Sequence, residues 1–226
     1  MTSANRRVWL TTAAVGSALA LVALTVLVAT GSIGFVDQFA VDHLMPATRP
    51  HSGVNPSGWS LTPSLDTSYH GPDRALSLVA HLIALLGSPI VAGLGVLALC
   101  GLLWRQGRRN AAAIWLGAFV VANLVEVVGK LTIERPSLDR SVGSHVLSLH
   151  AYDSSFPSGH MLRATFLVAM FVWVEPRTRF WAPALCALVG AMLVVDGDHV
   201  VTDVVGAILA AVACAALAAI ITEPPP

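Results

Sequence analysis

Long apolar stretches alternate with polar segments along the whole chain. A membrane-spanning helix needs about 20 mainly apolar residues, and six stretches approach that length. They run over about 8–31, 76–104, 111–133, 159–174, 180–195 and 204–221. Two polar segments, 37–74 and 134–157, are predicted to be loops. The pattern predicts an all-α integral membrane protein with six transmembrane helices in a bundle, residues 1–226 forming a single membrane domain.

The composition agrees with a protein of the cell membrane. The chain is 55% hydrophobic and 12% charged, whereas soluble domains carry roughly 25% charged residues. The net charge is zero, so the chain has no excess of basic residues that would indicate a nucleic-acid partner. The cysteines (Cys100, Cys186 and Cys214) each lie in an apolar stretch and are expected to be small core residues.

The first apolar stretch resembles a signal peptide in position but not in length. It is free of charge from Val8 to Val36, whereas the apolar region of a signal peptide spans roughly 7–15 residues. We therefore expect a retained helix.

Short basic segments predict the orientation of the helices. Arg6 and Arg7 precede the first helix, RQGRR (105–109) follows the second and EPRTR (175–179) follows the fourth. In a six-helix chain these segments share one side, which the positive-inside rule makes cytoplasmic. Both long loops and the turn DGDHVVTD then face the extracytoplasmic side, so we expect the active chemistry there in this multi-pass protein.

Two cations lie where the third predicted helix meets that side. Lys130 is the sole lysine of the chain, and Arg135 follows in LTIERPS, where Pro136 ends the helix. A charge at membrane depth costs a few kcal/mol unless it faces a polar cavity or a partner. Lys130 is therefore either a snorkelling lysine at a helix end or, with Arg135, half of an anion site.

The stretch FPSGHMLRA (156–164) begins the fourth predicted helix. Pro157 suits a first helical turn, and Ser158 and Gly159 leave the backbone open. Free N–H groups and the positive end of the helix dipole form an anion site, and His160 lies in that first turn. The alternative is a capped helix start with an incidental histidine.

A second histidine precedes the last predicted helix. His199 and Asp203 are four residues apart in DHVVTD and therefore share a helix face. A carboxylate on one imidazole nitrogen fixes the tautomer and leaves the other nitrogen free to attack. A plain polar pair, or a His/Asp metal cluster, remains open from this spacing alone.

Taken together, Lys-x4-Arg-Pro, Pro-Ser-Gly-His and His-x-x-x-Asp resemble the type 2 phosphatidic acid phosphatase (PAP2) superfamily between Lys130 and Ala207. The resemblance implies a six-helix lipid phosphatase without a metal or other cofactor. It assigns phosphate binding to Lys130, Arg135, Ser158 and Gly159, with roles for three more residues. His199 attacks phosphorus and becomes a phosphohistidine, Asp203 orients His199, and His160 protonates the leaving oxygen.

The chain departs from the family pattern at two arginine positions. Ser137 stands where the first motif usually has arginine, and Met192 and Leu193 replace the Ser-Arg of the third motif. Arg163 lies one turn after His160 in an otherwise apolar helix. We expect it to point at Asp153, Asp196, Asp198 or the bound phosphate, and to act as the replacement phosphate ligand.

These features predict a phosphatase that hydrolyses a phosphomonoester or diphosphate of a membrane lipid. The candidate substrates are a polyprenyl phosphate or diphosphate, phosphatidic acid and phosphatidylglycerol phosphate. Two alternatives remain. A catalytically degenerate PAP2-like binding or scaffold protein is compatible with the missing arginines, and a metal-dependent hydrolase would use His160, His199 and Asp203 as ligands. The sequence does not indicate an oligomeric state.

Overall fold

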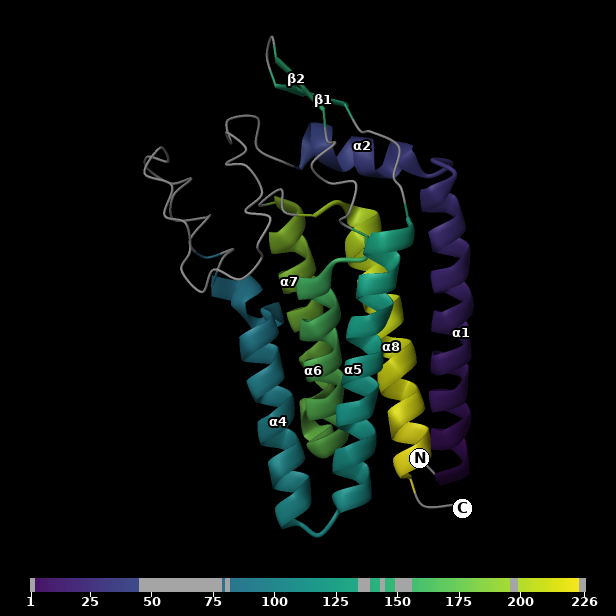
Figure 1. Cartoon of the computed structure of the whole chain (residues 1–226), viewed down its shortest axis with the longest axis vertical. Coiled ribbons are helices and arrows are strands. Elements are labelled where there is room, and N and C mark those ends of the chain that lie inside the picture. The colour runs from purple at the N-terminus through teal and green to yellow at the C-terminus, as the bar shows by residue number, and fades with distance from the viewer. Residues whose placement is uncertain are drawn as a thin grey trace.

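The computed structural model of the chain describes residues 3–44, 79, 82–133, 139–142, 145–148, 156–195 and 199–223. Within them the helices form a long bundle, with one helix lying across one end (Figure 1). The elements are α1 (Ser3–Ala29), α2 (Gly34–His43), the 3-10 helix η1 (Leu85–Gly87), α4 (Pro89–Arg105), α5 (Arg109–Thr132), β1 (Asp139–Val142), β2 (His145–Ser148), α6 (Gly159–Val174), the 3-10 helix η3 (Pro176–Phe180), α7 (Ala182–Val195) and α8 (Val201–Thr222).

Local chemistry sets the bounds of the bundle helices. Ser158 caps α6, which covers the range expected from the sequence and ends just before Glu175 and Pro176. The second predicted helix is divided, because η1 precedes Ser88 and α4 begins at Pro89. The Ser88 hydroxyl accepts a hydrogen bond from Val91 N–H at 3.3 Å, and proline suits the first helical turn, where no intrahelical acceptor is lost.

The segment 37–74, predicted to be a loop, begins inside a helix. Gly31 adopts a positive φ of 71°, which ends α1 as glycines after helices commonly do. The chain then turns, and α2 runs across the end of the bundle (Figure 1). Helix α2 is short and contains Asp37 and Asp42, so it lacks the apolar run of a membrane helix. The prediction of a loop was wrong for residues 37–43.

The second predicted loop, 134–157, holds a hairpin. Strands β1 and β2 pair antiparallel, with Asp139 opposite Ser148 and Val142 opposite His145. The rest of the described chain is helical or in turns, so the all-α prediction needs this small correction.

Three of the described helices have the length and apolar composition to cross a membrane: Asn5–Ala29, Arg109–Thr132 and Val201–Thr222. Three more, α4, α6 and α7, are apolar but shorter. Large apolar side chains of α1 and α5 are exposed, among them Leu19, Val22, Val121, Leu124 and Val128. Exposed apolar faces of this extent suit lipid rather than water, so the molecule is a membrane protein. The crossing of the membrane by six helices remains a prediction.

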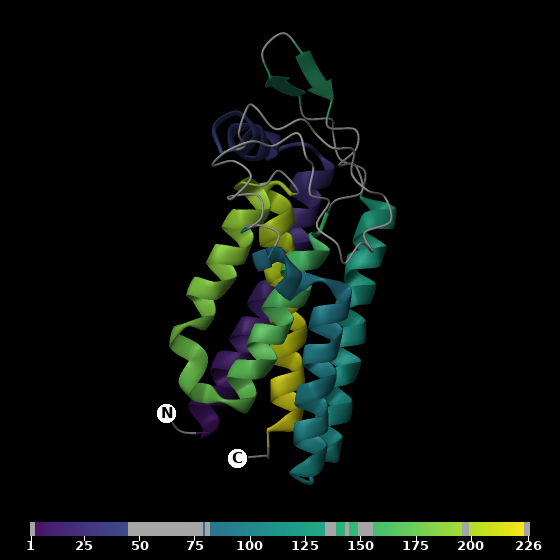
Figure 2. The same ribbon diagram turned by 90° about the vertical axis from the view of Figure 1, so that its left-hand side faces the viewer.

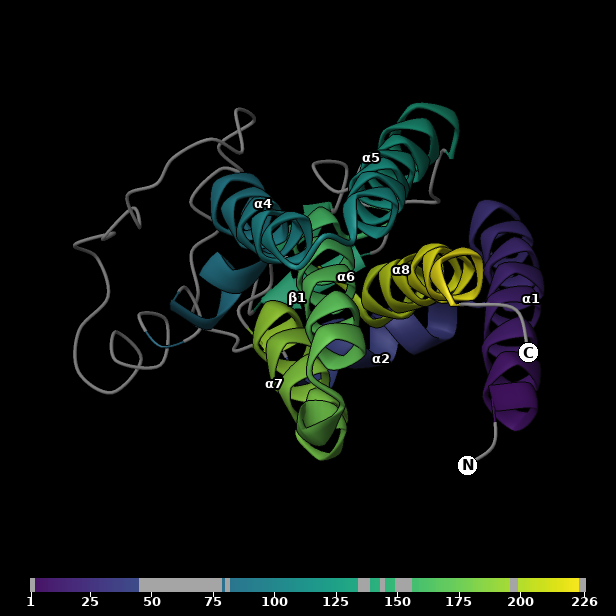
Figure 3. The ribbon, with the colours of Figure 1, turned by 90° about the horizontal axis from the view of Figure 1, so that it is seen from below.

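Helix α6 lies in the middle of the bundle. It packs against α4, α5, α7 and α8, as the view along the bundle shows (Figure 3). Helix α8 also packs against α1 and α5. Small side chains let helices approach closely in membranes, and the buried face of α8 consists largely of alanines (Ala207, Ala210, Ala211, Ala215, Ala218 and Ala219).

The two ends of the bundle differ in chemistry. Both termini lie at one end (Figure 2), where Arg6 Nε forms a 2.6 Å ion pair with Glu223. Arg109 begins α5 at the same end, and Arg108 stacks over Trp173 at 4.4 Å. The opposite end carries the C-terminus of α5 and the N-termini of α6 and α8. Of the site residues singled out by the sequence, those that the structure describes lie at that second end.

Candidate active site

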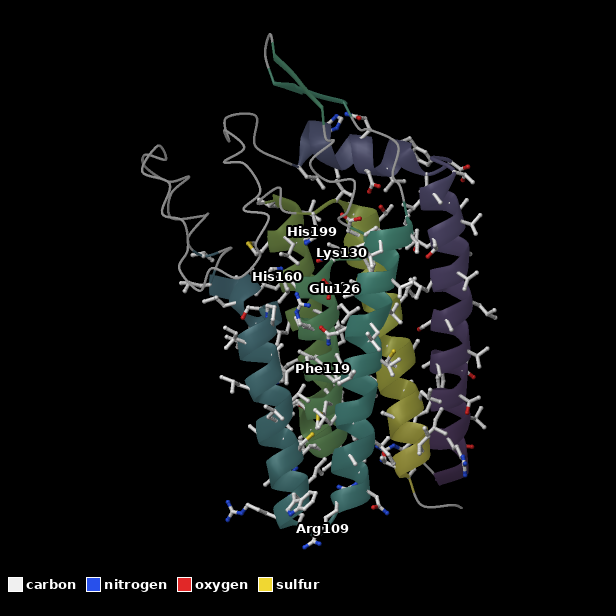
Figure 4. The ribbon with its side chains drawn as sticks, viewed as in Figure 1. Arg109, Phe119, Glu126, Lys130, His160 and His199 are labelled. Carbon is white, nitrogen blue, oxygen red and sulfur yellow. The ribbon has the colours of Figure 1, made fainter. Side chains whose placement is uncertain are left out.

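Three helix ends bring the predicted residues together. Lys130 lies in the last turn of α5, His160 in the first turn of α6, and His199 just before α8. All three lie toward the same end of the bundle in Figure 4, opposite the end that carries Arg109. A continuous series of contacts, described below, joins these helix ends.

The start of α6 is anchored to α8. The Ser158 hydroxyl accepts a hydrogen bond from Met161 N–H at 3.3 Å, which makes Ser158 the N-cap residue. Its own N–H donates to the Asp203 carbonyl at 3.1 Å. Ser158 is completely buried. The cap uses the hydroxyl as an acceptor and does not use its proton. The donation of that proton to phosphate stays a prediction.

His199 and Asp203 face one another across the first turn of α8. His199 Nδ1 lies 3.5 Å from Asp203 Oδ2, the outer limit of a hydrogen bond, and no aligned partner for Nδ1 occurs in the described part of the chain. Asp203 is fully buried, and the same Oδ2 accepts from Val200 N–H at 3.4 Å. Catalytic hydrogen bonds are often long before substrate binds, but the orienting role expected of Asp203 stays a prediction.

A buried carboxylate that the sequence analysis did not single out links two of the predicted cations. Glu126 Oε1 accepts from Lys130 Nζ at 2.7 Å, and its Oε2 accepts from Arg163 Nη1 at 2.6 Å. Glu126 is 6% exposed. The three side chains form a cluster with one net positive charge, in which Glu126 and Arg163 are buried and Lys130 is partly exposed. The spacing of Glu126 and Lys130, one helical turn apart, was the signal that would have found the pair.

Arg163 points to partners other than those predicted. Besides Glu126, it donates from Nε to the Gly87 carbonyl at 2.8 Å and from Nη1 to Asn123 Oδ1 at 3.2 Å. The carboxylates expected as partners, Asp153, Asp196 and Asp198, lie outside the described residues, as does Arg135. Arg163 thus ties η1 and α5 to α6. Its role as a phosphate ligand stays a prediction beside this structural one.

Gly159 is required by the close approach of this cluster. A Cβ at Gly159 would overlap Glu126 Oε1 and stand 2.6 Å from Arg163 Nη2. The ion pair therefore lies directly against the first helical residue of α6. This brings the cations next to the helix N-terminus, where N–H groups without intrahelical partners favour anions.

We expect Gly159→Ala to destabilise the protein by about 1–3 kcal/mol, the usual cost of forcing a methyl group into a packed site. Gly101→Ala in α4 is the matched control, because its Cβ meets nothing within 4 Å. That change should be neutral or stabilising by up to about 1 kcal/mol. Denaturant unfolding in detergent measures both. Equal stability of the two variants would contradict the close packing at Gly159.

The arginine position of the third motif is part of the core. Leu193 is 1% exposed, and its carbonyl accepts from His199 N–H at 3.2 Å. The residue thus holds the backbone of His199 but brings no charge. Among the described residues, no three His, Cys, Asp or Glu side chains are grouped to hold a metal ion.

The motifs that resemble the PAP2 superfamily thus lie at three helix ends of a helical membrane bundle. The PAP2 superfamily model matches residues 111–224, just over half of the chain. The chain belongs to the PAP2 superfamily.

A solved structure shares the fold. It is the crystal structure of a transmembrane PAP2-type phosphatidylglycerolphosphate phosphatase from Bacillus subtilis. The TM-score is 0.60 at 21% sequence identity, covering 92% of this chain and 94% of that one. No curated protein sequence matches the chain.

Proposed function

We propose that the protein is a membrane lipid phosphatase that removes phosphate from a lipid phosphomonoester or diphosphate. The observation that carries the proposal is the convergence of Lys130, the α6 N-terminus and the His199–Asp203 pair at one end of the bundle. Phosphoryl transfer depends mostly on positioning and on stabilising negative charge. Cations, helix N–H groups and an oriented imidazole provide both.

The proposed division of labour follows the roles that the resemblance to the PAP2 superfamily implies. Lys130, Arg135, Ser158 and the Gly159 backbone bind the phosphate oxygens. Because Nδ1 of His199 faces Asp203, Nε2 is the atom that attacks phosphorus.

The bond from phosphorus to the lipid oxygen breaks as the bond to His199 forms. His160 gives its proton to the departing oxygen and then takes one from water. That water attacks the phosphohistidine, which releases inorganic phosphate and restores both histidines.

The lipid tail stays in the bilayer while the head group reaches the site from the extracytoplasmic side. The grouping of basic residues at the opposite end of the bundle supports this orientation. The Bacillus subtilis structure makes phosphatidylglycerol phosphate one candidate substrate. Phosphatidic acid and polyprenyl phosphates present the same phosphate to the same residues, so all belong in the assay.

The first test is phosphate release by purified protein in detergent, with each lipid phosphate supplied separately. We expect turnover of at least one of them, and we expect EDTA to leave the rate unchanged because the proposed nucleophile is an imidazole. Heat-inactivated protein controls for free phosphate in the lipids. A rate abolished by EDTA and restored by a divalent metal would replace the phosphohistidine mechanism by a metal-dependent one.

The second candidate function is a PAP2-like binding or scaffold protein without catalysis. Glu126 favours it, because this internal carboxylate already engages Lys130 and Arg163, and Leu193 replaces an arginine. Vanadate resembles the transition state of phosphoryl transfer, so its binding distinguishes a phosphatase from a degenerate binding protein. A phosphatase should bind vanadate in competition with substrate, whereas a degenerate protein should neither bind vanadate nor release phosphate from any lipid.

A further inference from the structure

A buried carboxylate joins α2 to the first turn of α8. Asp37, in the first turn of α2, is 1% exposed. Its Oδ1 accepts from Thr202 N–H at 3.0 Å, and its Oδ2 accepts from Thr202 Oγ1 at 2.6 Å. Thr202 is itself 2% exposed. The two residues are 165 positions apart in the chain, so this contact is a feature of the tertiary fold.

The contact supplies a cap that α8 lacks. The N-cap residue of α8 is Val200, whose side chain has no acceptor. A serine, threonine or aspartate in that position would accept a hydrogen bond from the second or third helical N–H. Thr202 is the second helical residue, and Asp37 accepts its N–H from another helix. A negative charge at a helix N-terminus is favourable in itself.

The capped turn carries Asp203 of the proposed catalytic pair, and His199 lies just before it. Asp203 directly follows Thr202, and its Oδ2 lies 3.5 Å from His199 Nδ1 and 3.4 Å from Val200 N–H. Both distances are at the long end of the hydrogen-bond range. A small rotation of this turn would therefore separate the carboxylate from the ring.

We propose that Asp37 is a positioning residue, which holds the first turn of α8 so that Asp203 faces His199. Helix α2 is then a brace for the site rather than a connector between α1 and the following segment. The catalytic consequence rests on the proposed phosphatase function. The structural consequence, a fixed orientation of the His199 ring, does not depend on that function.

Kinetics of Asp37→Ala test the catalytic consequence. We expect kcat to fall at least about tenfold, since a shift of 1 Å in a catalytic group can cost about 100-fold. KM should stay within about twofold, because the phosphate ligands on α5 and α6 are untouched. Asp37→Asn should recover most of the loss, because its amide oxygen accepts from Thr202 N–H and its amide group donates to Thr202 Oγ1.

Phe35→Ala is the matched control on the same helix. Phe35 is 73% exposed, on the side of α2 away from Asp37, and its variant should keep the kcat of the original protein. A loss of activity shared by Phe35→Ala and Asp37→Ala, or an Asp37→Ala protein with unchanged kcat, would overturn the proposal.

Thr202→Val tests the same contact from α8. It keeps the shape and the backbone N–H but removes the hydroxyl donor, so kcat should fall severalfold. In the double variant the two effects should not add, because Asp37→Ala already removes the hydroxyl bond that Thr202→Val removes. If Asp37→Ala does not fold, the kcat values of Thr202→Val and Asp37→Asn provide the test instead. Additive effects would overturn a direct coupling.

A spectroscopic measurement separates this inference from the proposed function. With nitrogen-15 histidine in detergent micelles, the ring signals of His199, assigned by their loss in His199→Ala, should shift in Asp37→Ala but not in Phe35→Ala. This outcome supports the brace even if no lipid phosphate is hydrolysed. Unchanged His199 signals in Asp37→Ala would overturn it, whatever the activity.

Discussion

His199→Ala is expected to reduce phosphate release by about 10⁴-fold or more, as the loss of a covalent nucleophile typically does. The phosphorylated intermediate should disappear with it. After a rapid quench in base, which preserves phosphohistidine, radiolabelled substrate should mark the original protein but not the variant. The fold should survive, because the side chain of His199 is 13% exposed and Asp203 keeps its bond from Val200 N–H. Thermal unfolding in detergent checks this.

Two further variants test the assignment of roles. Asp203→Asn should lower the rate less than loss of the nucleophile, by roughly 10²–10⁴-fold, because it disturbs the tautomer of His199 while keeping the shape. His160→Ala should slow formation of the intermediate without preventing it, most strongly for lipids with poor leaving groups. If His160→Ala abolished labelling and His199→Ala kept it, the roles of the two histidines would be exchanged.

The bundle helices could be predicted because their apolar stretches and their start and stop residues are local signals in the sequence. Residues 159–174 could be predicted closely, because Pro157 and Ser158 start α6 and Pro176 follows its end. Helix α2 could not, since ten residues with two aspartates resemble a polar loop. Helix α2 is stabilised by the packing of its buried face on α8. Because α8 is distant in the sequence, no residue near α2 indicates this packing.

The same distinction applies to the site. His199 and Asp203 were predicted as a pair because one helical turn separates them. The Glu126 link to Lys130 has the same spacing and was available in the sequence, but Glu126 was hidden inside an apolar segment. Its second partner, Arg163, lies 37 positions away, so nothing in the local pattern indicated it. Aspartates or the bound phosphate were therefore predicted as partners of Arg163, and the carboxylate of Glu126 that binds it was missed.

The Glu126–Arg163 pair gives the largest expected effect on stability. Removing one partner of a buried ion pair typically costs about 3–5 kcal/mol, because the other charge stays buried. Glu126→Leu should reach this range, since Arg163, whose side chain is 9% exposed, loses its carboxylate. Arg163→Met should cost less, because Glu126 keeps Lys130, whose side chain is 34% exposed and partly solvated. Denaturant unfolding in detergent measures the difference.

The double variant Glu126→Leu/Arg163→Met should be more stable than Glu126→Leu alone, because no unpaired charge remains. Its activity decides what Arg163 does. If Arg163 serves to hold Glu126 in place, the double variant should keep turnover within about tenfold of the original, since Lys130 is then free to bind phosphate. If Arg163 is the phosphate ligand that replaces the missing arginine, turnover should fall by about 10³-fold or more, even in a well-folded double variant. A double variant no more stable than Glu126→Leu would show that the cost at this position arises from packing rather than from the unpaired guanidinium.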